Sequence, residues 1–252
     1  MTYCVGILVR EGLVMVADTR TNAGLDNIAT FRKLHVFEQP GERAVCLATA
    51  GNLAVSQSVV TFLAEGLLNE ATGKTETIMT VDSMFKAAQM VGRAIREVQE
   101  SSGIVHEQQQ TGGPFDVSML LGGQIGKGRL RLFMIYSAGN FIEATADTPY
   151  LQIGEHKYGK PILDRSVTEK TELYDALKLG LISMDSTIRS NLGVGLPIDL
   201  AVIRRDARAL DLTYRIDSSE PYFHDLRVRW SSALREAYLA IPRPPYGDKK
   251  EP

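Results

Sequence analysis

MTYCVGILVREGLVMVAD, residues 1–18, contains two apolar runs with a turn-like tripeptide between them. The first run follows directly on Thr2 and extends to Val9, and the second covers Leu13 to Ala17. Arg10-Glu11-Gly12 between the two runs is typical of a turn that joins antiparallel strands. The sequence therefore predicts that the chain enters a buried strand within two residues of its start.

Thr2 is a candidate N-terminal nucleophile. An initiator methionine is usually removed when the next side chain is small, so the mature chain would begin with a residue that carries both a hydroxyl and a free α-amine. An α-amine has a pKa of roughly 8, so a substantial fraction is neutral near pH 7 and can accept the hydroxyl proton. Many chains begin Met-Thr by chance, and further residues have to support the interpretation.

Asp18 and Lys33 are candidate partners of this nucleophile. A hairpin brings the far end of its second strand back beside the near end of its first, so Asp18 should lie next to Thr2. The run from Thr30 to Phe37 predicts another strand, which offers Lys33 as a cation. A buried pair would hold the lysine charged, and that charge would keep the α-amine neutral and favour the threonine alkoxide. The alternative is an ordinary strand-end aspartate and a solvated lysine.

Thr2, Asp18 and Lys33 together resemble the N-terminal-threonine triad of proteasome β-type subunits. The segment from Cys46 to Ala54 is similar to the part of that family where a strand ends in a glycine whose backbone N–H faces the reacting carbonyl. Gly51 occupies that place in this sequence. Within the superfamily, the Met-Thr-Tyr-Cys-Val-Gly start and the carboxy-terminal extension are most similar to the bacterial proteasome-like Anbu group.

The resemblance implies an α+β fold, the four-layer α/β/β/α sandwich of N-terminal-nucleophile hydrolases. It also implies a threonine-type endopeptidase that cleaves unfolded polypeptides or peptides through an acyl-enzyme, inside a self-assembled ring or spiral of identical subunits. Its side-chain preference would depend on residues near Thr21, Phe31, His35 and Thr49. Two alternatives stay open: an amidohydrolase of the same superfamily that acts on a small or modified amide, and a non-catalytic scaffold subunit. The need for an unfoldase partner also stays open.

Two positions depart from the family pattern. Proteasomal β subunits have a serine in a Gly-Ser-Gly turn beside the nucleophile, and Glu155 in Gly154-Glu155-His156 stands in its place. Ser190 stands where the family has an aspartate, and Asp185 on the same expected helix is a possible substitute. These changes predict a differently positioned amine, a narrow substrate range or weak activity.

The rest of the chain predicts alternating groups of strands and helices. Apolar residues at helical spacing indicate helices after Asn52 (Leu53, Val60, Leu63 and Leu67) and over about 80–100, 157–164 and 172–191. Further strands are expected over Phe115–Leu121, Leu130–Tyr136, Phe141–Ala144, Ile198–Ile203 and Leu210–Ile216. The Gly122–Gly128 segment predicts a hairpin turn, because it lacks the spacing and the hydroxyl residue of a phosphate loop.

The sequence predicts a catalytic domain over 2–216 and a carboxy-terminal helix with a disordered tail over 217–252. Serines before Pro221 are typical of a helix start, and Leu226, Trp230, Leu234, Ala237 and Ile241 form one stripe on that helix. The stripe would pack either on its own domain or on the next subunit. The polar segment from Tyr246 to Pro252 is typical of disorder.

Composition excludes several classes of function. A formal net charge of −2 over 252 residues gives no electrostatic reason to expect nucleic acid as a partner. No apolar run of 18 residues predicts a membrane span, and no signal peptide leads the chain. Cys4 and Cys46 lie in apolar strands, which favours reduced core thiols in a cytoplasmic protein. The four histidines show no metal-ligand spacing, so neither a metal nor a cofactor is expected.

Overall fold

The computed structural model describes residues 1–22, 28–69, 73–101, 113 and 115–246. The chain divides into two units, Met1–Ser218 and Ser219–Pro252. All but the first residue of the expected tail, Tyr246 to Pro252, lie outside the described residues.

Two five-stranded antiparallel sheets form the first unit. The first sheet has the order β12-β1-β2-β13-β14 and consists of Tyr150–Gly154, Tyr3–Leu8, Gly12–Asp18, Ile198–Arg204 and Leu210–Ile216. The second has the order β11-β10-β9-β6-β5 and consists of Phe141–Glu143, Arg131–Ile135, Val117–Ile125, Arg43–Gly51 and Leu34–Gln39. Two small hairpins complete the strands: β3 (Arg20–Asn22) with β4 (Ile28–Thr30), and β7 (Leu67–Asn69) with β8 (Lys74–Glu76).

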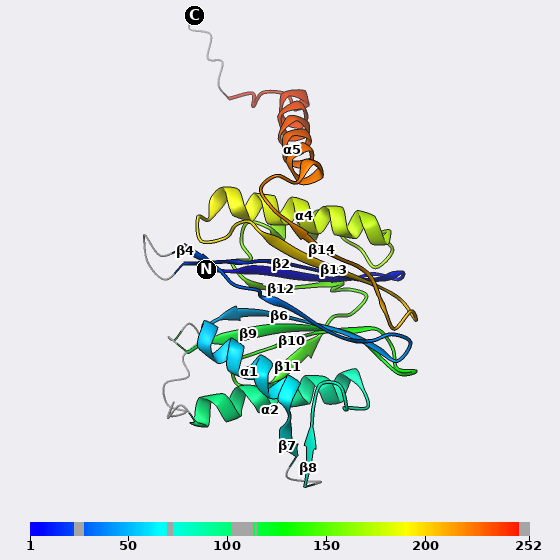
Figure 1. The fold of residues 1–252 in the computed structure, drawn as a ribbon. Helices are drawn as coiled ribbons and strands as arrows, with labels where there is room; N and C mark the ends of the chain where they lie inside the picture. Colours follow the sequence, from blue (N-terminus) through cyan, green and yellow to red (C-terminus); the bar gives the residue numbers. More distant parts are fainter. Residues whose placement is uncertain (23–27, 70–72, 102–112, 114, 247–252) are drawn as a thin grey trace, which may run out of the picture. The chain divides into compact units, whose positions relative to one another are not determined.

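Helices cover the outer face of each sheet, which gives the expected four layers (Figure 1). Helices α1 (Leu53–Glu65) and α2 (Met84–Ser101) lie against the second sheet, and α4 (Leu173–Ser190) lies against the first, with α3 (Lys160–Ser166) packed beside α4. The predicted four-layer α/β/β/α sandwich is therefore confirmed.

Strand β6 explains why the central strands are apolar on both faces. Its residues Val45 and Leu47 belong to the core shared with α1 and α2. The intervening Ala44, Cys46 and Ala48 belong to the core between the two sheets. Because successive side chains on a strand point to opposite faces, a strand buried on both sides needs a continuous apolar run.

Several elements differ from the sequence expectation for local reasons. Helix α1 ends at Glu65 because Gly66 has a φ of 122°, so Leu67 belongs to β7 and not to the helix. Strand β9 continues to Ile125, where it pairs with Arg43, so the predicted turn is confined to the end of the Gly122–Gly128 segment. The small hairpins were not predicted, because each strand in them has only three residues.

Strand β12 is the most consequential element that the sequence did not predict. Its residues Tyr-Leu-Gln-Ile-Gly carry little strand pattern, but the backbone pairs with β1 from Tyr3↔Gly154 to Ile7↔Tyr150. Sheet order thus places β12 on one side of β1 and β2 on the other. The start of β1 lies between two different strands, and each brings its own polar residues.

The second unit contains α5, Pro221–Ala240. Its N-cap is Glu220, whose side chain accepts a hydrogen bond from the Phe223 N–H at 2.6 Å, so the expected serine cap was wrong. Leu234 of the predicted stripe is half exposed, and Ile241 follows the helix and is exposed.

No helix in the described part of the chain is long and apolar enough to cross a membrane.

Candidate active site

Asp18 lies where the hairpin register places it, beside the start of β1. Cys4 pairs with Ala17 in the ladder, so the next residues, Tyr3 and Asp18, face each other. The Tyr3 backbone N–H donates to Asp18 Oδ1 at 3.0 Å, and the Asp18 side chain has no exposed surface. The carboxylate is therefore fixed directly beside the peptide unit that follows Thr2.

Lys33 completes a buried ion pair with Asp18. Its Nζ donates to Asp18 Oδ1 at 2.8 Å and to the Arg20 carbonyl oxygen at 2.6 Å, and the residue is 4% exposed. Lys33 does not belong to a strand, because β5 begins one residue later and the chain before it comes from the β3–β4 hairpin. Its own carbonyl accepts the Thr49 N–H at 3.0 Å, which fixes the segment against β6.

The electrostatics of Asp18 result from opposing effects. Burial raises the pKa of the Asp18 carboxyl above its usual value, while the Lys33 ammonium and the N–H groups of Tyr3 and Gly195 oppose that rise. Gly195 donates to the second carboxylate oxygen at 3.3 Å. A buried pair of this kind is costly to break, because either partner alone would be an uncompensated charge.

Thr2 is held from the opposite side by the turn after β12. The Glu155 backbone N–H donates to the Thr2 carbonyl oxygen at 2.7 Å, and Thr2 is 9% exposed. Gly154 has a φ of 81°, and a Cβ atom at this position would lie 2.1 Å from the Thr2 oxygen. Only glycine fits so close to the Thr2 backbone.

Gly51 ends β6 at the same end of the sandwich. It pairs with Val117 of β9, has a φ of 103°, and leaves no space for a Cβ, which would lie 2.2 Å from the Asp116 oxygen. Asn52 follows as the N-cap of α1 and accepts the Val55 N–H at 3.1 Å. The strand-to-helix turn on which the oxyanion assignment depends is present, and the direction of the Gly51 N–H toward a substrate stays a prediction.

The two residues that depart from the family pattern follow different elements: Glu155 comes directly after β12, and Ser190 is the last residue of α4. Glu155 lies beside Thr2, as the family resemblance implied, and its Oε2 accepts a hydrogen bond from Asn191 Nδ2 at 3.1 Å. Ser190 ends α4 with an exposed side chain. Asp185 is fully buried and accepts a hydrogen bond from Arg189 at 3.2 Å. Sequence reasoning missed Asn191 and Gly195, because both follow α4 and reach the site only through the tertiary fold.

The residues expected to set the side-chain preference are divided between core and surface. Thr49 is buried, Thr21 and His35 are half-buried, and Phe31 is exposed. Burial, with the nearby Arg32 guanidinium, lowers the pKa of His35 below its usual value. Both cysteines are buried free thiols, and Cys4 lies 3.7 Å from the Thr49 carbonyl oxygen, behind the ion pair.

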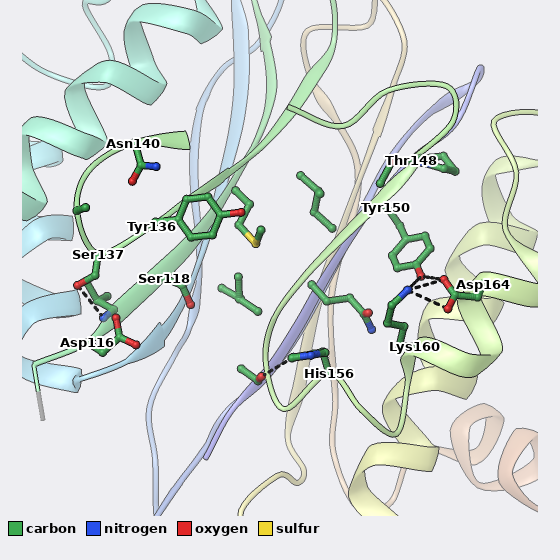
Figure 2. A pocket seen from close by; sticks show the side chains of 18 of the residues that line it. Asp116, Ser118, Tyr136, Ser137, Asn140, Thr148, Tyr150, His156, Lys160 and Asp164 are labelled. Carbon is green, nitrogen blue, oxygen red and sulfur yellow. Dashed lines mark hydrogen bonds and ion pairs between the residues drawn. The ribbon is translucent and has the colours of Figure 1, made fainter. Parts of the chain in front are cut away.

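A cavity of about 910 Å³ lies beside β12, and all the residues of that strand, Tyr150 to Gly154, line it (Figure 2). Gly154 and His156, the two neighbours of Glu155, line it together with Asp116 and Val117, and Val117 pairs with Gly51. Figure 2 shows the Tyr136 ring directed into this space. The cavity thus borders both β12, which pairs with the strand that follows Thr2, and β9, which pairs with the strand that ends in Gly51.

The far wall of the cavity carries a cluster of charged side chains (Figure 2). Lys160 Nζ donates to the two Asp164 oxygens at 2.7 and 2.8 Å and to Tyr150 Oη at 3.1 Å, and the Tyr150 hydroxyl also donates to Asp164.

Within the described residues no group of three or more His, Cys, Asp or Glu side chains is placed to hold a metal ion.

Comparison with known proteins adds independent information. The sequence pattern of the family described as "Proteasome subunit" matches residues 2–203. Similar solved structures include Anbu (ancestral beta-subunit) from Yersinia bercovieri, with 46% identity, a TM-score of 0.88, and 98% of this chain and 100% of that chain covered. Anbu from Hyphomicrobium sp. strain MC1 is similar too, with 47% identity, a TM-score of 0.85, and coverage of 96% and 98%. So is the helical assembly of the Anbu complex from Pseudomonas aeruginosa, with 45% identity, a TM-score of 0.86, and coverage of 97% and 98%. A search of curated proteins finds no match.

Proposed function

Because this chain belongs to the proteasome subunit family and, within it, to the Anbu group, we propose that it is an N-terminal-threonine hydrolase that cleaves amide bonds in peptides or unfolded polypeptides. The observation that supports this most strongly is the buried Asp18–Lys33 pair beside the backbone of Thr2. A lysine ammonium in this position lowers the cost of forming a nearby alkoxide.

The proposed reaction begins when Met1 has been removed. Thr2 Oγ attacks the substrate carbonyl while the α-amine of Thr2, directly or through a water, accepts the hydroxyl proton. The Gly51 N–H stabilises the oxyanion, and a donor of this kind contributes about 3 kcal/mol in comparable sites. The amine then returns the proton to the leaving nitrogen, and water hydrolyses the acyl-enzyme.

Substrate has space on the β12 side of the nucleophile. The Asp18–Lys33 pair closes the β2 side, whereas the 910 Å³ cavity opens beside Gly154 and Val117. We assign this cavity to the leaving-group part of the substrate. Its aromatic and aliphatic lining (Tyr136, Tyr150, Met134 and Leu151) suits an apolar side chain.

Assembly into a homo-oligomer is part of the proposal. The similar protein from Pseudomonas aeruginosa forms a helical assembly. Helix α5 exposes apolar residues (Val228, Leu234, Tyr238 and Leu239) of a kind that usually becomes buried between subunits. We propose contact between copies of this chain through α5, and we place the protein in the cytoplasm.

Glu155 and Asn191 favour a second candidate, hydrolysis of a small or modified amide. A carboxylate in place of the family's serine changes the charge beside the nucleophile. A narrow substrate range follows if that charge excludes acidic or extended substrates. A third candidate, a non-catalytic scaffold, requires that Met1 stays attached and blocks the amine.

A turnover screen tests the function. A library of unstructured peptides and a panel of small amides are incubated with the wild type, with Thr2→Ser and with Thr2→Ala, and products are read by mass spectrometry. We expect peptide cleavage by the wild type, slower cleavage by Thr2→Ser, and a loss of at least about a thousandfold in Thr2→Ala. Turnover of small amides alone supports the second candidate. Cleavage that survives in Thr2→Ala rejects Thr2 as the nucleophile.

A further inference from the structure

We propose that the Glu155 carboxylate binds the freed α-amino group of Thr2 and positions it as the base of the reaction. The inference rests on the proposed hydrolase function, and it assigns a purpose to the residue that departs most clearly from the family pattern. Glu155 acts through the amine and is therefore a positioning residue. The argument depends on three features: where Glu155 lies, what holds its carboxylate, and which charges surround it.

The position of Glu155 follows from the β1–β12 ladder. Tyr3 pairs with Gly154 as the last pair of the ladder, and beyond it the backbone N–H of Glu155 donates to the Thr2 carbonyl oxygen at 2.7 Å. This hydrogen bond keeps Glu155 directly beside Thr2, although both residues lie outside the strands. A glutamate side chain is long enough to reach from there to the nitrogen of Thr2. The residue is 9% exposed, so its charge lies largely out of bulk water.

Asn191 holds the carboxylate toward the chain terminus. Its Nδ2 donates to Glu155 Oε2 at 3.1 Å, and its Oδ1 accepts the Gly193 N–H at 2.9 Å. Met1 lies against the same loop, because a Cβ atom added to Gly193 would be 2.6 Å from the Met1 Cβ. Removing Met1 therefore frees space beside the loop that fixes Glu155, and it places the new amine there.

Several other charged groups in this part of the described chain have partners of their own. From the β2 side, Asp18 is paired with Lys33. From β3, Arg20 donates to the Leu192 carbonyl oxygen, and from α4, Arg189 pairs with Asp185. The Glu155 carboxylate accepts its hydrogen bond from the neutral Asn191 amide, so an ammonium at Thr2 is a suitable cationic partner.

Such contact has a definite chemical consequence. When Thr2 Oγ attacks, its proton moves to the amine, and Glu155 stabilises the ammonium that forms. The same attraction raises the pKa of the resting amine, because an opposite charge nearby favours the charged form. Glu155 thus orients the amine and favours the proton transfer. It also raises the pH at which the amine becomes neutral and can act as a base.

The pKa of the Thr2 amine can be measured without any substrate. Mature protein is trace-labelled with acetic anhydride over a series of pH values, and acetylation of the N-terminal peptide is read by mass spectrometry. We expect the midpoint of the labelling curve to fall by about one pH unit in Glu155→Gln. Glu155→Asp, which keeps the charge and shortens its reach, should lie between the two. Glu169→Gln, which removes a glutamate paired with Arg10 far from Thr2 along the strand, should match the wild type.

The outcomes separate this inference from the proposed function. An equal midpoint in wild type and Glu155→Gln overturns the inference, even if peptides are cleaved. A shifted midpoint supports it even where no amide is hydrolysed, in which case the proposed function fails by itself. Where turnover is present, the pH profile of kcat/KM should shift by the same amount as the midpoint. If Glu155→Gln does not fold, Glu155→Asp decides alone, and an unchanged midpoint in that variant counts against the proposal.

Discussion

The two sides of Thr2 are built differently. On the β2 side, a carboxylate and an ammonium are fully paired, buried and fixed by backbone N–H groups from Tyr3 and Gly195. On the β12 side, Glu155 in the turn after β12 bonds to Asn191 at the end of α4, and the two neighbours of Glu155 line a cavity of about 910 Å³. We call the side with the Asp18–Lys33 pair the closed side and the side with Glu155 and Asn191 the open side. The closed side suits the maintenance of a fixed charge distribution beside Thr2. The open side suits the admission of substrate and the positioning of a mobile amine.

Breaking the closed side should have the largest effect. Lys33→Met removes the ammonium that lies 2.8 Å from Asp18 Oδ1, and we expect a loss of about 3–5 kcal/mol in the free energy of unfolding. Urea denaturation provides the measurement. The double variant Asp18→Asn/Lys33→Met should recover part of the loss, because no uncompensated charge is then left buried.

An exposed pair on the cavity wall provides a matched control. Lys160 pairs with Asp164 at 2.7 Å, but both side chains are about half exposed. Lys160→Ala should therefore cost less than about 1 kcal/mol. A similar cost for Lys33→Met and Lys160→Ala would contradict the difference between a buried and a solvated pair.

Breaking the open side should have the next largest effect. Gly154→Ala places a methyl group 2.1 Å from the Thr2 carbonyl oxygen at a φ of 81°, and we expect a loss of about 3 kcal/mol together with displaced nucleophile geometry. Thermal unfolding and turnover are measured together. Gly41→Ala is the control, since Gly41 also has a positive φ (84°) but has no atom within 4 Å, so only the backbone cost of about 1 kcal/mol applies. Equal losses of stability in Gly154→Ala and Gly41→Ala would show that the close contact with Thr2 adds nothing to the cost of the substitution.

The two buried thiols, Cys4 and Cys46, should make the free energy of unfolding depend on pH. Burial raises the pKa of Cys46 to about 12, and burial, with the nearby Asp18 charge, raises that of Cys4. Because the unfolded chain releases these protons near pH 8.5, the folded state loses stability as pH rises above that value, by about 1.4 kcal/mol per pH unit for each thiol. Unfolding midpoints at pH 8 and 10 should fall less in Cys46→Ala than in the wild type. Rapid alkylation of either thiol in the native protein would contradict their burial.

The contrast between the two sides also explains how much the sequence could predict. Asp18 was predictable because a short hairpin determines its own register. Lys33 was proposed from the apolar run between Thr30 and Phe37, and Gly51 was identified through the family resemblance. The four layers were implied by the family resemblance, and strands that are apolar on both faces agree with them. Strand β12 was missed because Tyr150–Gly154 has five residues and no clear alternation. Asn191 and the cavity were missed because they depend on how α4, β9 and β12 meet, which local pattern does not encode.

The central claim is that a free amine and a hydroxyl on Thr2 act together at the start of β1. Mass spectrometry of the mature protein before and after treatment with an epoxyketone or a β-lactone tests this claim directly. We expect a chain that begins at Thr2 and gains one inhibitor, with the adduct on Thr2 and no adduct in Thr2→Ala. A chain that retains Met1, or one that stays unlabelled across several such compounds, would contradict the account.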